Sequence, residues 1–450
     1  MPDQRGLSGS RRPRPGRVAR LCVALAAVCA ITAVLIGATS ATNATNAAAS
    51  ADGAGRTGAD VVPVVALDRS DRVAGGILLS RDELMALPTS GPGWEAIMAR
   101  VEDPYGGSYV LGERDDANKD VLAHALAGAR LDDAAHKTFV RDKVEQVMTE
   151  PRNTEDLLAT LRQLQTYIIS ADLIDLASYD PGLDGRFRTW LADEIRFDYE
   201  GGGGGGSVIS NHNRKPNNYG THAGATRVAA ALYLGDEEEL QAARDIWYGW
   251  ATGDPDYSHP TRRWTGTDWQ CDPDRPAGIN AAGCTRDGNS IDGILPEDQE
   301  RCGEYSWPPC ETNYIHGATD GMTLAFWMLE RYGEDPWAWG DQAALRQMEW
   351  KYANDQPPYD GFRWQIPVIE AAYGVDFPGN APQATSTNFG FADWWAQRAG
   401  APAPESRSDS APPPDPPATS GPGLWLVAVI VVTGVLLLSL AILVVRRSRR

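Results

Sequence analysis

Apolar residues recur every three or four positions in six stretches in the middle of the chain, which predicts amphipathic helices. These stretches cover residues 153–177, 182–197, 224–235, 236–251, 317–333 and 336–353. Several end at a glycine, a common residue just past a helix C-terminus. Strand-like alternation is scarce, so we expect an all-α domain. The two longest connections are expected to be loops that carry function, namely 199–221 and 252–316.

Two apolar stretches at the ends of the chain are uninterrupted and therefore differ from these helices. Residues 1–41 contain arginines, then an apolar run, then small residues, as in a secretory signal or an uncleaved N-terminal anchor. Residues 424–445 carry no charge and are long enough to cross a bilayer core of ~30 Å as a C-terminal transmembrane helix. The basic tail 446–450 is expected in the cytoplasm. We therefore predict a single-pass protein of the cell membrane with an extracellular middle part.

The composition divides that middle part further. Residues 42–64 are rich in Ala, Thr, Asn and Gly and are expected to be a flexible lead-in. Residues 401–423 are rich in proline and are expected to be an extended linker that buries no core. The folded domain is therefore expected to span 65–400.

The charge of the external part excludes one class of partner. The chain has 41 basic and 60 acidic residues, of which ten basic and one acidic lie in 1–50 and 423–450. Residues 51–422 therefore hold 31 basic and 59 acidic residues, a net charge of −28. Binding of nucleic acid requires a basic surface, so no nucleic-acid partner is expected. An anionic substrate would need local arginines and lysines to overcome this field.

Four of the six cysteines lie in the external domain, at Cys271, Cys284, Cys302 and Cys310. Outside the cell, four cysteines suggest two disulfides. Three pairings are possible, and proximity in the sequence favours Cys271–Cys284 and Cys302–Cys310. No C-x-x-C pair occurs, so a zinc site is not expected.

Candidate chemistry gathers where histidines meet other polar and aromatic residues. The chain has six histidines, and four lie in the two expected loop segments or at their ends. Three of these four, His212, His222 and His316, stand among other polar and aromatic residues. A lone histidine is usually structural, but Asn, Tyr and Arg accompany these three. The segments around them therefore suggest a polar site.

Three segments resemble one enzyme family. Residues 217–236, which begin N-N-Y-G-T-H-A-G, resemble the Asn-Asn-His-Gly-Thr-Trp helix start of alginate lyase-like polysaccharide lyases. Residues 292–322, which read D-G-I-L-P-E-D-Q-E-R and later N-Y-I-H-G, resemble that family's Asp-Gly-x-x-Pro-x-Glu segment with its later Arg and Tyr. Residues 161–176 resemble an earlier helix of the family, so the resemblance covers roughly 155–330.

This resemblance implies an (α/α) toroid, an incomplete barrel of helix pairs, that cleaves a polymer of uronic acid by β-elimination. The reaction removes a weakly acidic proton at C5, so the neighbouring carboxylate must be neutralised by hydrogen bonds or positive charge. A base must take the C5 proton and an acid must protonate the departing O4. Neither a metal nor another cofactor is required, and none is expected.

The resemblance also implies residue roles. Asn218 matches the family's carboxylate-binding Asn, and Asn217 stands beside it in the motif. Arg301 matches the Arg that supplies positive charge and could lower the pKa of a nearby tyrosine. Tyr314 matches the Tyr that donates the proton.

The family's base position is changed in this chain. Tyr219 stands where the family has His, and His222 stands where it has Trp. Either could be the base, and Asn218 and His222 share a helix face only if the helix has begun by residue 218. Because a cysteine-flanked insertion precedes Tyr314, Tyr305 is its rival as proton donor.

Other residues could bind the substrate. Arg214, Lys215 and His316 are candidate contacts to an anionic polysaccharide, and exposed tryptophans could stack on sugars, although Trp247 and Trp250 have the spacing of core residues. Asn217, Asn218 and Thr221 could also be only a cap of a helix at 222. Arg301 could equally be an ordinary ion-pair residue, and Tyr314 a core tyrosine.

Two other functions remain open. One is a glycoside hydrolase on an α/α scaffold that uses a carboxylate pair such as Asp292 and Glu297. For these two residues, however, binding of a loop is the default interpretation. The other function is a glycan-binding protein that has lost catalysis.

Overall fold

A computed structural model describes residues 76–109, 111–112, 117–152, 154, 156–201, 204–379 and 388–397. The predicted signal or anchor 1–41, lead-in 42–64, linker 401–423, transmembrane helix 424–445 and tail 446–450 lie outside these residues. Within the described ranges, no helix is both long and apolar enough to cross a membrane.

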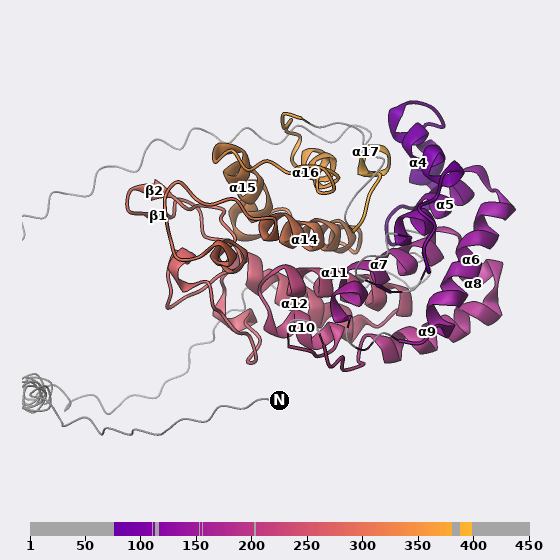
Figure 1. Ribbon diagram of the computed structural model, residues 1–450, viewed down its shortest axis with the longest axis horizontal. Helices are drawn as coiled ribbons and strands as arrows, with labels where there is room; N and C mark the ends of the chain where they lie inside the picture. The colour runs from indigo at the N-terminus through magenta and orange to yellow at the C-terminus, as the bar shows by residue number, and fades with distance from the viewer. Residues whose placement is uncertain are drawn as a thin grey trace, which may run out of the picture. The chain divides into compact units, whose positions relative to one another are not determined.

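The described part of the chain is all-α, as predicted (Figure 1). Its helices are α3 (Arg81–Ala86), α4 (Pro92–Glu102), α5 (Asn118–Leu131), α6 (Ala134–Thr149), α7 (Leu157–Leu173), α8 (Leu176–Tyr179), α9 (Pro181–Glu194), α10 (Val208–Arg214), α11 (Asn218–Leu234), α12 (Glu237–Thr252), α13 (Pro296–Gln299), α14 (Tyr314–Arg331), α15 (Trp339–Ala353), α16 (Gln365–Tyr373) and α17 (Ala392–Trp395). The short 3-10 helices are η1 (Pro255–Tyr257), η2 (Thr267–Trp269) and η3 (Glu300–Cys302). A small antiparallel hairpin pairs β1 (Thr285–Arg286) with β2 (Asn289–Ser290).

The six predicted helices correspond to α7, α9, α11, α12, α14 and α15, but the expected loops were drawn too long. Helix α10 lies inside 199–221, where Ser207 and Ser210 cap its start reciprocally. Helix α11 begins at Asn218 rather than at 222 or 224, because Asn217 is its N-cap. The segment 252–316 likewise contains α13, three 3-10 helices, the hairpin and the first turn of α14.

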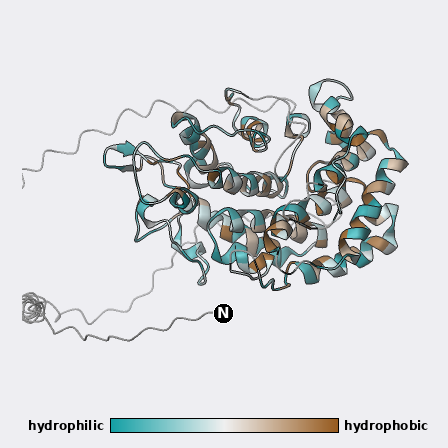
Figure 2. Cartoon of the chain, viewed as in Figure 1, coloured by the Kyte–Doolittle hydropathy of each residue, from teal (hydrophilic) through white to brown (hydrophobic). Residues whose placement is uncertain are grey.

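The helices pack in a closed circuit. Helix α5 contacts α7, which contacts α11, and the sequence of contacts continues through α14, α16, α17 and α4 back to α5. Helices α6, α9, α12 and α15 pack against members of this circuit and against one another. The helices carry mixed hydrophobic and hydrophilic residues along their length, as expected when one side faces a core (Figure 2). Trp247 and Trp250 are buried, as their spacing predicted.

Helices α11 and α14 approach each other at backbone contact distance. A Cβ atom added at Gly321 would lie 2.3 Å from the backbone carbonyl carbon of Thr221. A Cβ atom added at Gly317, one turn earlier, would lie 3.7 Å from the Cβ of Asn218. The pairs of neighbours therefore advance in the same direction along both helices, so α11 and α14 run parallel and begin at the same end.

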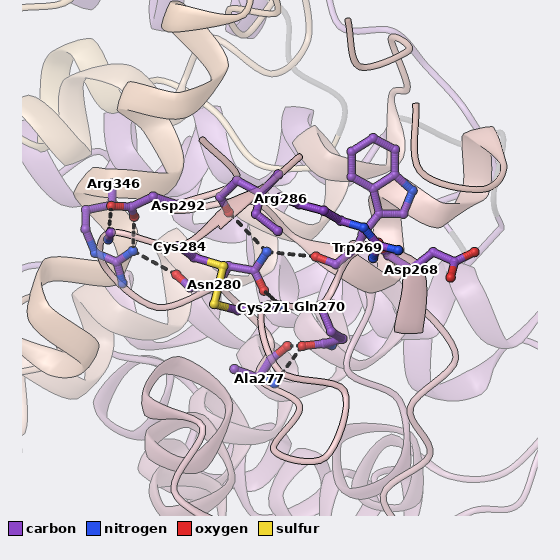
Figure 3. The surroundings of a disulfide bond; sticks show 12 residues. Asp268, Trp269, Gln270, Cys271, Ala277, Asn280, Cys284, Arg286, Asp292 and Arg346 are labelled. Carbon is purple, nitrogen blue, oxygen red and sulfur yellow. Dashed lines mark hydrogen bonds and ion pairs between the residues drawn. A yellow bond between two sulfur atoms is a disulfide. The ribbon is translucent and has the colours of Figure 1, made fainter. Parts of the chain in front are cut away.

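Both predicted disulfides form. Cys271 pairs with Cys284 at a Cα–Cα distance of 5.8 Å, and Cys302 pairs with Cys310 at 6.1 Å. Beside the first bond, Asn280 donates from its side chain to the carbonyls of Trp269 and Ile291 and accepts from the Cys271 N–H (Figure 3). The disulfides and this asparagine give the long segment after α12 a fixed shape.

Gly321→Ala should destabilise the protein because the added methyl would clash with the backbone of α11, and overpacking costs ~1–3 kcal/mol. Urea unfolding would measure the loss. Gly185→Ala, in the interior of α9, is the matched control, because nothing lies within 4 Å of an added Cβ. The control should gain ~0.5–1 kcal/mol from the better helix former. Equal effects of the two substitutions would contradict the close contact.

Candidate functional site

The start of α11 is both a cap and part of a polar site. The side chain of Asn217 accepts a hydrogen bond from the Tyr219 N–H at 3.1 Å, which confirms its capping role. Asn218 is the first helical residue and is buried. A Cβ added at Gly317 would lie 3.7 Å from the Asn218 Cβ and 3.8 Å from the His222 Nε2. Asn218 and His222 therefore share the face of α11 that meets α14.

A buried carboxyl group holds this helix start. Asp298, in the short helix α13, accepts a hydrogen bond from the Asn218 N–H at 3.0 Å. Burial raises the pKa of Asp298 well above its ordinary value, while the positive charge of Arg301 acts in the opposite direction. Among the described residues its Oδ2 has no hydrogen-bond partner. Asp298 was not among the predicted site residues, although it lies in the P-E-D-Q-E-R segment.

Asp292 and Glu297 bind loops, which confirms their default interpretation. Glu297 accepts hydrogen bonds from the Thr265 hydroxyl at 2.6 Å and the Gly266 N–H at 2.7 Å. Asp292 accepts from the Gly283 N–H at 2.7 Å and forms an ion pair with the buried Arg346 (Figure 3). Both carboxylates are thus committed to the structure of the segment after α12.

Arg301 lies against Tyr314 at the start of α14. The guanidinium carbon is 4.4 Å from the centre of the tyrosine ring, within the range of a cation–π contact. Tyr314 is half-buried and Arg301 is exposed, so solvent reaches this pair. The rival Tyr305 is engaged elsewhere, because its hydroxyl donates to the Arg286 carbonyl at 2.8 Å and its ring packs against Trp269.

The two candidate bases lie on different sides of α11. His222 is fully buried, and neither ring nitrogen has a hydrogen-bond partner within the described ranges. Burial, reinforced by the charge of Arg162, holds the pKa of His222 well below its ordinary value, so the imidazole is neutral. Tyr219 is half-buried on the side of Lys215, whose ammonium lies 5.0 Å from the tyrosine ring.

A second cluster of buried polar side chains lies on and around α14. Burial, reinforced by Lys351, lowers the pKa of His316 to about 2, and neither of its ring nitrogens is hydrogen-bonded in the described structure. Asp320 accepts hydrogen bonds from Gln365 and, at 2.7 Å, from Asn388, and burial raises its pKa to about 7. Lys351 donates to the Thr319 hydroxyl at 2.6 Å, and burial lowers its pKa well below the ordinary value.

Of these residues, His316 was predicted as a substrate contact, and that contact stays a prediction. Asp320 was missed although it lies in the segment 292–322. Lys351, Gln365 and Asn388 were missed because they come from parts of the chain outside the motif segments.

Arg214 and Lys215 differ in their contacts. The Arg214 guanidinium donates to the carbonyls of Ser210 at 3.1 Å and Gly205 at 3.3 Å, and so connects Gly205, in the loop before α10, to that helix. In the described part of the chain the Lys215 ammonium makes no hydrogen bond. Contact of either residue with a substrate stays a prediction.

A hollow of about 240 Å³ lies beside α6, α7 and α9. It is lined by Trp190 and by the ion pair of Arg152 with the buried Glu194. Glu194 also accepts a hydrogen bond from the Tyr199 hydroxyl, so both members of this ion pair already have partners within the structure. Across the residues described, no three His, Cys, Asp or Glu side chains are placed to hold a metal ion. The starts of α11 and α14 are therefore the stronger candidate site.

Comparisons with models of known protein families, with curated proteins and with solved structures each found no match. The site is therefore interpreted from its own residues.

Asp320→Asn should change how stability depends on pH. The pKa of Asp320 rises from 3.8 to about 7 in the folded protein, so its stabilising contribution is full below pH 3.8 and is lost as the pH rises to about 7. The stability difference between the native protein and the variant should therefore fall over this range, by an amount that urea unfolding at several pH values would measure. The buried histidines are common to both proteins and cancel in the difference. A constant difference from pH 4 to 7 would contradict a protonated Asp320.

Proposed function

We propose that this chain is a cell-surface polysaccharide lyase that cleaves a uronic-acid polysaccharide by β-elimination. One observation carries the proposal: α11 and α14 are parallel, so Asn218 and His222 lie at the same end as Arg301 and Tyr314. These side chains supply an amide, a neutral imidazole, a positive charge and a phenol, which are the groups that the reaction needs. The closed circuit of helix contacts supports an (α/α) toroid, an incomplete barrel of helix pairs.

In this mechanism Asn218 and Arg301 stabilise the substrate carboxylate as negative charge develops beside C5. A base removes the C5 proton, the electron pair forms a double bond between C4 and C5, and O4 leaves with a proton from Tyr314. The hydrogen bond from the Asn218 N–H to Asp298 fixes the first turn of α11 and so positions the Asn218 side chain.

His222 is the favoured base because of its place and its protonation state. It lies one turn after Asn218, on the same face of α11, and its depressed pKa leaves it unprotonated at neutral pH. Tyr219 occupies the family's base position in the sequence, but its ring lies near Lys215. The proposed base, His222, therefore lies about one helical turn after Tyr219, which occupies the family's base position.

The glycoside hydrolase is the weaker alternative because Asp292 and Glu297 are occupied by loop contacts. A non-catalytic glycan-binding protein has one observation in its favour, the complete burial of His222. A panel of uronate polysaccharides separates the lyase from both alternatives, because only a lyase forms a product with an ultraviolet-absorbing double bond conjugated to a carboxylate.

Tyr314→Phe and Arg301→Ala should each abolish formation of the ultraviolet-absorbing product without unfolding the domain. Loss of a positioned acid typically reduces the rate by ~10²–10⁴-fold. Tyr305→Phe is the matched control, because it removes a tyrosine hydroxyl that is bonded within the structure. Full activity of either site variant, or equal loss in the control, would refute the assignment.

His222→Gln and Tyr219→Phe should identify the base. The first is expected to lose ~10²-fold or more in kcat, and the second should retain activity. Gly317→Ala gives an independent test, because its methyl would lie 3.8 Å from the His222 Nε2 at ordinary contact distance. It should reduce activity while leaving the thermal unfolding temperature unchanged or higher. The opposite ranking of His222→Gln and Tyr219→Phe would return the base to Tyr219.

A further inference from the structure

The hollow beside α6, α7 and α9 is large enough to hold a ligand. Its volume of about 240 Å³ corresponds to about eight water molecules at ~30 Å³ each, which is roughly the size of one sugar ring. It opens to solvent at Glu150 and Arg152, which are exposed. The polar and aromatic residues that line it are Glu150, Arg152, Thr160, Trp190, Glu194 and Tyr199.

Connected hydrogen bonds hold the polar side of this hollow. The Arg152 guanidinium donates to the buried Glu194 carboxylate at 2.6 Å. Glu194 also accepts from the Tyr199 hydroxyl, which in turn accepts from the Thr160 hydroxyl at 2.8 Å. Trp190 lines another part of the wall and is half-buried. Polar groups at fixed positions beside an aromatic ring suit a sugar, because its hydroxyls form hydrogen bonds and its C–H faces pack on aromatic rings.

The charged side chains in the wall do not favour an anion. Arg152 is the one cation among the described residues that line the hollow, and Glu194 neutralises it. Glu150 adds a further negative charge, so one arginine and two glutamates give the lining a net charge of −1. The carboxylate of a uronate would be repelled by this charge, whereas an uncharged sugar would not.

The hollow is connected to the start of α11 by two neighbouring elements. The backbone of Tyr199 pairs with that of Gly206, directly before α10, and α10 leads to the start of α11. On the other side, the Thr226 hydroxyl of α11 donates to the carbonyl of Leu161, the residue after Thr160, at 2.8 Å. This contact lies ~12 Å along α11 from its first residue. The hollow is therefore within reach of a glycan of a few units bound at the start of α11.

We propose that this hollow binds an uncharged sugar unit of the glycan that is cleaved at the start of α11. The substrate is then a heteropolysaccharide that contains both uronate units and uncharged sugars. Its reacting uronate lies near the positive charge of Arg301, and its uncharged unit lies where Glu150 and Glu194 outweigh Arg152. That the ligand is a sugar of this glycan rests on the proposed function, whereas the preference for an uncharged ligand follows from the charges in the wall.

Binding of D-glucose, D-galactose and D-mannose to the full-length chain, each compared with its matching uronate, tests the charge preference. Saturation-transfer NMR at low ionic strength detects the weak binding expected of single sugars. At least one uncharged sugar should bind, and its uronate should bind ~10-fold or more weakly, the factor for one unit of repulsion at ~12 Å and an effective dielectric constant of ~20. Binding of none of the uncharged sugars, or equal binding of sugar and uronate, would overturn the proposal.

Arg152→Lys tests whether the sugar binds in the hollow, because it keeps the charge beside Glu194 and removes the forked donors of the guanidinium. It should weaken binding of the uncharged sugar ~5-fold, the value of about one hydrogen bond. Arg186→Lys is the matched control, because Arg186 also pairs with a glutamate, Glu145, but lies outside the hollow. It should change binding by less than ~2-fold. Equal weakening by the two variants would refute the assignment to the hollow.

Glu150→Lys tests the electrostatic basis, because it changes the charge of the lining from −1 to +1 at an exposed position. It should strengthen uronate binding ~10-fold or more and leave binding of the uncharged sugar unchanged. Glu349→Lys, at an exposed position of α15 outside the hollow, makes the same change of charge and should have little effect. An unaltered preference in Glu150→Lys would contradict the proposal.

Cleavage assays separate this proposal from the proposed reaction. A polymer that alternates uronate with an uncharged sugar should be cleaved with a higher kcat/KM than a homopolymer of uronate. Faster cleavage of the homopolymer would refute the substrate class and leave the lyase reaction standing. Absence of ultraviolet-absorbing product from every uronate polysaccharide would refute the reaction, and the binding results would still decide whether the hollow holds an uncharged sugar.

Discussion

The backbone contact between Gly321 and Thr221 is the constraint on which the candidate site depends. It brings α14 against α11 more closely than a side chain would allow, and it sets the two helices parallel with their starts together. As a result, the amide of Asn218 and the imidazole of His222 face the helix that begins with Tyr314. Asp298, buried on α13, accepts a hydrogen bond from the Asn218 N–H, so backbone packing and a buried carboxyl group together hold the start of α11.

Much of the fold could be predicted because long helices with one buried side show a regular apolar pattern. Helices α9 and α12 are examples. Helix α5 gave no such signal, because nearly every residue from Asn118 to Ala129 is buried, including Lys119 and Asp120, and a helix without an exposed side has no polar stripe. Helix α10 is only seven residues long and depends on its serine cap, so its polar sequence resembled a loop.

The site was only partly visible in the sequence. The shared face of Asn218 and His222 was predicted on condition that the helix begin by residue 218, and the Asn217 cap meets that condition. The burial of Asp298 was not predictable, since the adjacent Glu297 has the same charge and the two point to different partners. Lys351 was also hidden, because the burial that lowers its pKa comes from the packing of other helices around it.

The Cys302–Cys310 disulfide makes the positions of Arg301 and Tyr314 independent of the length of the loop between the two cysteines. The loop begins just after Arg301 and ends before Tyr314. The Cα atoms of Cys302 and Cys310, which close it, are only 6.1 Å apart. Residues 303–309, including the exposed Trp307, therefore form a closed excursion whose ends are fixed by the covalent bridge. A change at the exposed tip of this excursion, around Trp307, can therefore leave the contact between the Arg301 cation and the Tyr314 phenol in place.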